Sequence, residues 1–189
     1  MEDPEARILI VGPSRRLVHE RLLSGPAGLL SLAPPWFCPK YWRSKRTLDF
    51  PNGARVTLAS PHSWDRECVR GSSASLVWMD APEEWYRPLE AYETFCGLAR
   101  HRTARMRQLG IPARCIITAR ASPTAFLKHV IDSAPGLVRG RLSTFDNAEH
   151  VDPRFIEMGH RLRGTIQGRR DYLGELFFSP EDLASGVSR

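Results

Sequence analysis

The sequence predicts an α/β protein whose mainly parallel sheet is flanked by helices, and three observations support this fold class. Apolar runs without polar alternation occur at residues 8–11, 76–79 and 115–117, as is typical of strands that are buried on both faces. Segments with helix signals alternate with these runs. The chain has 189 residues, 42% of them hydrophobic, which is enough for one domain with a substantial core.

The first half of the chain begins with an expected strand at 6–11. Ser14 follows it as an expected cap for a helix that runs to about Ser24. Residues 47–50 and 54–58 alternate around Pro51-Asn52-Gly53, which predicts a β-hairpin, and we expect this hairpin to protrude. The polar segment 60–73 is expected to be a loop. The run 76–80 then predicts an inner strand of the sheet.

The second half continues the alternation. A helical region is expected from about Glu83 to Leu109, with a break or kink at Pro88. Residues 114–118 and 138–143 predict strands, with a helix between them that starts at Ser122-Pro123. Further helices are expected from Asp152-Pro153 and over 167–178. The tail, 179–189, has little apolar content and is expected to fray.

Composition narrows the function classes. The net charge of +6 favours an acidic partner, with nucleic acid first, although coding from a GC-rich genome produces the same arginine excess. No apolar run approaches the ~20 residues of a membrane helix. The cysteines show no zinc spacing and are expected to be reduced thiols of a cytoplasmic protein. None of the three lysines follows a glycine, so the sequence has no Gly-Lys-Ser/Thr phosphate loop; these lysines are Lys40, Lys45 and Lys128.

A basic stretch interleaved with aromatic residues lies at 40–46. Basic side chains can pair with phosphates while aromatic rings stack on bases. The candidates for binding double-stranded DNA are Lys40, Arg43, Lys45 and Arg46, beside Tyr41 and Trp42. The alternative is a solvated loop that covers Trp42.

Asp80 ends the apolar run 76–79. Open α/β sheets place their ligand sites at the carboxyl ends of strands, and in P-loop NTPases an aspartate at this position helps to hold Mg²⁺ beside the nucleotide phosphates. The alternative is a helix cap, because many buried strands end in an aspartate that caps the next helix.

Several stretches, in order, resemble the large terminase subunit of tailed bacteriophages and gene transfer agents, which is the ATPase of the DNA-packaging motor. They are 8–12 (Ile-Leu-Ile-Val-Gly), 25–30 (Gly-Pro-Ala-Gly-Leu-Leu), 48–54 (Leu-Asp-Phe-Pro-Asn-Gly-Ala), Arg70-Gly71, 77–80 (Val-Trp-Met-Asp), 143–147 (Ser-Thr-Phe-Asp-Asn), Gly164-Thr165, Gly168-Arg169 and 174–176 (Gly-Glu-Leu). The resemblance covers about residues 6–178. It implies a P-loop NTPase-like fold, Mg²⁺ and ATP as cofactors, and double-stranded DNA as partner. It further implies a homo-oligomeric ring with a small terminase subunit and a portal, in the cytoplasm of a bacterial host.

The resemblance also implies roles for three residues. Asp80 would coordinate Mg²⁺. Arg70 would act in trans on the nucleotide of a neighbouring subunit, and Thr118 would sense the γ-phosphate. The alternatives are a loop arginine that pairs with Asp65 or Glu67, and a structural threonine at a strand end.

The sequence departs from the family at the residues that matter most for catalysis. The family's P-loop strand would precede residue 6, Ala81 replaces the glutamate that polarises the attacking water, and residues 117–121 do not match the coupling segment. The acidic cluster of the nuclease domain is missing as well. We therefore expect an ATPase fold that is incomplete at its N-terminus, with a partial core at 1–145, a helical lid-like or linker-like subdomain at 146–178 and a frayed tail at 179–189.

This chain alone is not expected to hydrolyse ATP. One interpretation is a component of the packaging motor that works with parts supplied by another chain. The alternative is a catalytically inactive DNA-binding or assembly module, or the remnant of a degraded prophage terminase gene.

Overall fold

The computed structural model describes residues 3–178, and the predicted frayed tail, 179–189, lies outside the described residues. The chain divides into two compact units, Met1–Thr118 and Ala119–Arg189. The sequence places a boundary at 145/146 instead, which falls inside the second unit. Each unit is described by itself.

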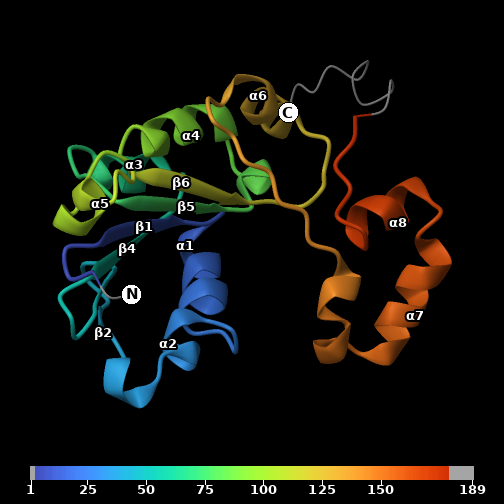
Figure 1. Ribbon diagram of the computed structural model, residues 1–189, viewed down its shortest axis with the longest axis horizontal. Helices are drawn as coiled ribbons and strands as arrows, with labels where there is room; N and C mark the ends of the chain where they lie inside the picture. Colours follow the sequence, from blue (N-terminus) through green and yellow to red (C-terminus); the bar gives the residue numbers. More distant parts are fainter. Residues whose placement is uncertain (1–2, 179–189) are drawn as a thin grey trace. The chain divides into compact units, whose positions relative to one another are not determined.

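The first unit contains a six-stranded sheet with the order β2-β3-β4-β1-β5-β6 (Figure 1). Strands β4, β1, β5 and β6 are parallel to one another, whereas β3 is antiparallel to its two neighbours β2 and β4. The mainly parallel α/β sheet is therefore confirmed. The strands are β1 (Arg7–Val11), β2 (Lys40–Trp42), β3 (Thr47–Asp49), β4 (Arg55–Ala59), β5 (Leu76–Asp80) and β6 (Arg114–Thr118).

Helices cover both faces of this sheet, because alternate residues of its inner strands point to opposite sides. Leu9 and Val11 of β1 belong to one core with Phe95, whereas Ile10 belongs to a second core with Val18. The first core includes residues of α3 (Ser63–Val69) and α4 (Pro88–Cys96); the second is covered by α1 (Arg15–Leu17), its π-helical continuation η1 (Val18–Leu23) and α2 (Leu29–Leu32). Figure 1 shows these two groups of helices on either side of the strands.

The shorter elements of this unit are the 3₁₀ turns η2 (Pro35–Phe37) and η3 (Pro82–Glu84) and the helix α5 (Ala104–Gln108). The helical region expected over 83–109 is thus divided into three pieces. Helix α4 ends at its C-cap residue Gly97. Helix α5 begins after its N-cap residue Thr103, whose side chain accepts a hydrogen bond from the backbone N–H of Met106.

The structure corrects two predictions and one alternative for residues 40–73. The hairpin does not protrude, because β4 lies between β3 and β1, where Val56 is buried and pairs with Ile8. The stretch Lys40–Trp42 is not a loop but an edge strand that pairs with β3. The segment 60–73, predicted as a loop, contains α3, whose Val69 is buried in the first core.

The second unit contains α6 (Ala125–Ser133), η4 (Thr144–His150), α7 (Pro153–Leu162) and α8 (Ile166–Asp171). The strand predicted at 138–143 is wrong: these residues belong to no ladder, and Val138 and Leu142 are 91% and 84% exposed. The last helix begins near its expected position but ends at Asp171, well before residue 178.

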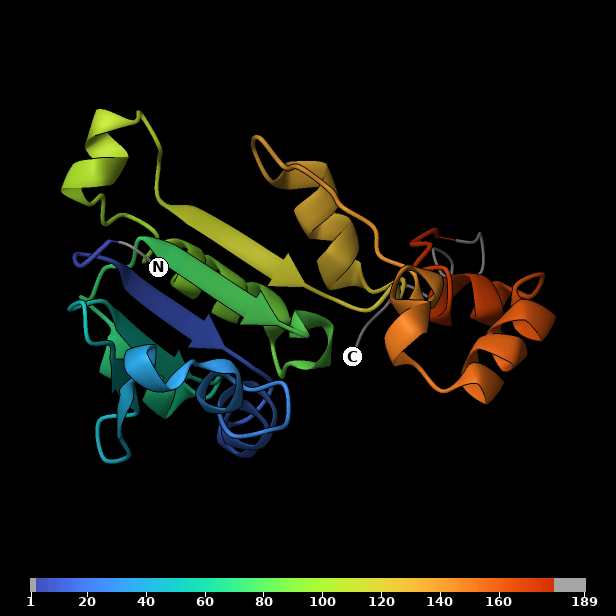
Figure 2. The same cartoon turned by 60° about the horizontal axis from the view of Figure 1, so that its bottom comes forward.

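Close packing holds η4, α7 and α8 together (Figure 2). A Cβ on Gly159 would lie 2.6 Å from the ring of Tyr172 and 3.1 Å from that of Phe145. The backbone N–H of Thr144 donates to the carbonyl of Tyr172 at 2.8 Å, and Ser143 forms a capping box with Asp146. Residues 143–147, which resemble a terminase motif, therefore form one local structure with Gly159 of α7 and Tyr172 after α8.

No helix among residues 3–178 is long and apolar enough to cross a membrane.

Candidate nucleotide and metal site

Asp80 lies at the carboxyl end of β5, directly opposite Thr118 at the end of β6. A chain of hydrogen bonds joins the two strand ends: the indole Nε1 of Trp78 donates to Thr118 Oγ1 at 2.9 Å, and this hydroxyl donates to Asp80 Oδ1 at 2.7 Å. The indole of Trp85 also donates to the backbone carbonyl of Asp80 at 3.1 Å. The carboxylate is thus held in one orientation at the edge of the sheet where α/β proteins bind ligands.

This arrangement suits a Mg²⁺ ion that is bound mainly by water and phosphate. Mg²⁺ prefers oxygen ligands and is commonly held by one or two carboxylates together with the phosphates of a substrate. Asp80 supplies a carboxylate oriented by Thr118. Among residues 3–178 no three His, Cys, Asp or Glu side chains cluster to form a complete metal cage. The residues present therefore fit the metal half of a nucleotide site, but not the phosphate cradle.

The resemblance to terminases implies a water-polarising carboxylate at the position that Ala81 occupies. The backbone of Ala81 is left-handed, with φ of 47°, and its N–H donates to the carbonyl of Thr118 at 2.8 Å. The chain then enters η3, which begins with Pro82. A methyl group cannot accept a proton from water, so this position provides no general base.

Arg70 precedes the amino end of β5, whereas Asp80 lies at its carboxyl end. It caps the C-terminus of α3, is exposed, and pairs with Glu67 at 3.1 Å. The five residues of β5 separate this end of the sheet from Asp80 by at least ~13 Å. The structure therefore brings Thr118, but not Arg70, to Asp80 within one chain.

The predicted DNA-binding stretch is partly engaged in contacts of its own. The ammonium of Lys40 lies 3.9 Å from the ring centre of Trp42, and that of Lys45 lies 5.7 Å away. The indole of Trp42 donates to Asp49 at 2.9 Å. Arg43 is exposed, whereas Arg46 points to a buried carboxylate on α3.

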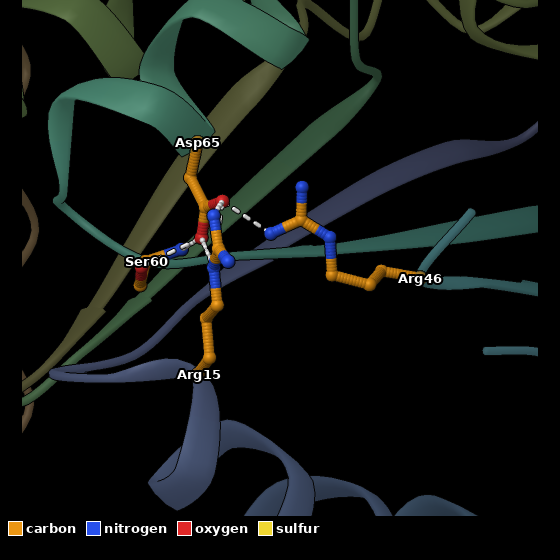
Figure 3. Close-up of polar contacts among 4 residues, drawn as sticks. All are labelled: Arg15, Arg46, Ser60 and Asp65. Atoms are coloured by element: carbon orange, nitrogen blue, oxygen red, sulfur yellow. Dashed lines mark hydrogen bonds and ion pairs between the residues drawn. The ribbon is translucent and has the colours of Figure 1, made fainter. Parts of the chain in front are cut away.

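That carboxylate is Asp65, the centre of a polar cluster that sequence reasoning missed (Figure 3). Its side chain is fully buried and accepts hydrogen bonds from Arg15, at 2.6 Å, and from Arg46. The hydroxyl and backbone N–H of Ser60 donate to its second oxygen at 2.6 and 3.0 Å. The cluster joins the start of α1, the turn between β2 and β3 and the residue after β4 to α3. The carboxyl ends of β1 and β4 lie at the same edge of the sheet as Asp80.

Burial disfavours the charged carboxylate of Asp65, but its bonds to Arg15, Ser60 and Arg46 outweigh burial and lower its pKa to about 2. A cavity of about 30 Å³ beside Arg15 and Arg46 has room for about one water molecule and not for a nucleotide. The cluster is therefore structural. Its only sequence signal, a polar residue in a predicted loop, was too weak to identify it.

Comparison with known proteins supports the fold. No family model matches the sequence, and no curated protein matches it. The chain is similar to the large terminase of a thermophilic bacteriophage, with a TM-score of 0.66 and 11% identity over 93% of this chain and 42% of that one. Structures of the same terminase in complex with ADP and with ATP-γ-S give TM-scores of 0.62 and 0.60, both at 11% identity. Both matches cover 93% of this chain, and they cover 42% and 41% of the terminase chain, respectively.

The chain thus spans about two fifths of the terminase structures that it matches. At this identity the comparison establishes the fold, which has the parallel sheet order and helical layers described above. We conclude that this chain has an α/β fold like that of phage large terminases.

Proposed function

We propose that the chain is a large-terminase-like component of a viral DNA-packaging motor, acting in the cytoplasm of a bacterial host. The observation that carries this proposal is the Trp78–Thr118–Asp80 chain of hydrogen bonds at the carboxyl edge of a terminase-like sheet. Asp80 would hold Mg²⁺, and Thr118 would orient its carboxylate and respond to the γ-phosphate. The motor would contain a ring of these chains, together with a small terminase subunit and a portal.

The nucleotide would be ATP, because the similar phage terminase has been solved with ADP and with ATP-γ-S. No Gly-Lys-Ser/Thr loop occurs in the 189 residues, so the phosphate-binding group must come from residues outside them. A neighbouring chain would supply Arg70 in trans, which is compatible with its location at the opposite end of β5 from Asp80.

Ala81 and the absence of a phosphate loop favour a second candidate, a catalytically inactive module that binds DNA or assembles with the motor. In this case the charge surplus, not the site at Asp80, would be the functional feature. Lys40, Arg43, Lys45 and Arg46 would then contact DNA, although the bonds of Arg46 to Asp65 leave it the least accessible of the four. The two candidates differ in one respect that can be measured: the first requires nucleotide for its function, and the second does not.

The first test is phosphate release by the isolated chain with Mg²⁺ and ATP, with and without double-stranded DNA. We expect no turnover above the blank, because phosphoryl transfer relies on positioning and charge stabilisation that these residues do not provide alone. The Asp80→Asn variant is the control. Turnover that this variant abolishes would show that the chain already contains a complete site.

A further inference from the structure

A second basic surface, distinct from the 40–46 stretch, surrounds α5. Between Thr94 and Ile131 the sequence contains no aspartate or glutamate at all. The same window has five arginines within fifteen residues, all of them exposed: Arg100, Arg102, Arg105, Arg107 and Arg114. We call these five residues the α5 arginine surface.

The fold brings these arginines together at the amino ends of β5 and β6. Arg114 is the first residue of β6, and Arg100 donates to the carbonyl of Ser72, just before β5, at 2.9 Å. Arg102 donates to the carbonyl of Ile111 at 3.2 Å, and Arg107 donates to the carbonyl of Arg102. Figure 1 places α5 at the tails of the β5 and β6 arrows, the end opposite to Asp80.

These contacts hold the side chains of Arg100, Arg102 and Arg107 in place without neutralising their charge. Arg100, Arg102 and Arg107 donate to backbone carbonyls, which carry no net charge. A guanidinium has five N–H donors, so one such bond leaves most of them for a phosphate. Among residues 3–178, Asp3 accepts a hydrogen bond from the Thr103 hydroxyl and Glu5 accepts one from the backbone of Ala104, both at the start of α5.

The chemistry of the surface favours duplex DNA as its partner. Phosphates of the DNA backbone are recognised by forked guanidinium groups without regard to sequence. Binding of single strands usually adds aromatic rings on which bases stack, but residues 100–114 include no Phe, Tyr or Trp. By contrast, the two aromatic residues of the 40–46 stretch accompany lysines, and Trp42 is already bonded to Asp49.

We propose that the α5 arginine surface is the main contact of this chain with the phosphate backbone of double-stranded DNA. The inference names the surface that binds the DNA partner, and to that extent it rests on the proposed function. It places DNA binding and the metal site at opposite ends of the same two strands, β5 and β6.

The test is a fluorescence-anisotropy titration of labelled duplex DNA, without nucleotide, at several salt concentrations. The substitutions Arg102→Gln, Arg107→Gln and Arg114→Gln are made together. Each phosphate contact contributes about 0.9 to the slope of log K against log salt, so we expect this triple variant to flatten the slope by about 2 to 3. The corresponding triple substitution to lysine keeps the charge and should retain most of the slope, which also shows that the fold tolerates changes at these positions.

Two matched triple variants remove the same charge elsewhere. One changes Lys40, Arg43 and Lys45 to glutamine; the other changes Arg16, Arg87 and Arg161, each of which pairs with a glutamate close to it in sequence. The Arg16, Arg87 and Arg161 variant should leave the slope nearly unchanged, and the 40–46 variant should flatten it clearly less than the α5 variant does. The inference is overturned if the 40–46 variant flattens the slope as much, if single-stranded DNA competes better than duplex, or if the chain binds anionic vesicles but not DNA. None of these outcomes depends on ATP turnover, so the proposed function is tested separately.

Discussion

Replacing Asp65 by asparagine should lower the free energy of unfolding by about 2–3 kcal/mol at neutral pH. The carboxylate is fully buried, and its pKa is lowered from 3.8 to about 2, a difference of nearly two units at about 1.4 kcal/mol each. The variant keeps the shape of the side chain but removes the charge that two arginines share. Chemical denaturation of both proteins at pH 7 measures the difference.

The lowered pKa of Asp65 also determines how the free energy of unfolding depends on pH. Because the folded-state pKa is below the unfolded value, the stabilisation is present above about pH 4 and is lost as pH falls towards 2. The native protein should therefore lose stability across this range more steeply than the asparagine variant. The control is Asp49→Asn, which breaks the exposed ion pair with Arg55 and should cost less than about 1 kcal/mol. Equal losses in the two variants would contradict a structural role for the buried cluster.

Replacing Gly168 by alanine should open the junction between α7 and α8. A Cβ at this position would lie 1.9 Å from the backbone carbonyl oxygen of Leu162, a distance that no real contact allows, so the backbone itself must move. We expect a cost of about 2–3 kcal/mol, despite the better helix propensity of alanine. Hydrogen exchange of the amides in 153–172 should show the loss of protection.

Gly164 provides the matched control, because a Cβ there meets nothing within 4 Å. Gly164→Ala should change protection little or slightly increase it. If both alanine variants behave alike, close packing is not the reason for glycine at position 168.

The parts of the fold that depend on local pattern were predictable. The apolar run before Asp80 and the run before Thr118 specified two buried strands, and parallel strands bring such end residues to one edge. The Asn52-Gly53 turn likewise located a hairpin. A pattern could not show that β4 also pairs with β1, because that pairing joins segments far apart in the sequence.

The missed features are all non-local. Asp65 is buried because Arg15 and Arg46, 50 and 19 residues away in sequence, converge on it. Lys40–Trp42 is a strand only because β3 is beside it. Residues 138–143 show the opposite error: their composition suits a strand, but no described strand lies beside them, so no ladder forms.

We propose that Asp80 and Thr118 form the metal half of a nucleotide site whose phosphate-binding half comes from elsewhere. The most direct measurement is phosphate release with Mg²⁺, ATP and duplex DNA after mixing this chain with the nearest polypeptide from the same genome that contains Gly-x-x-x-x-Gly-Lys-Ser/Thr. We expect turnover by the mixture that exceeds the sum of the two components, because the second polypeptide would supply both the phosphate loop and the water-polarising carboxylate that Ala81 does not provide. Asp80→Asn should reduce it about a hundredfold or more, and Thr118→Val should reduce it less, because threonine orients the carboxylate and responds to the γ-phosphate but does not hold the metal. Turnover that is unaffected by Asp80→Asn, or a mixture no more active than its separate components, would contradict the claim.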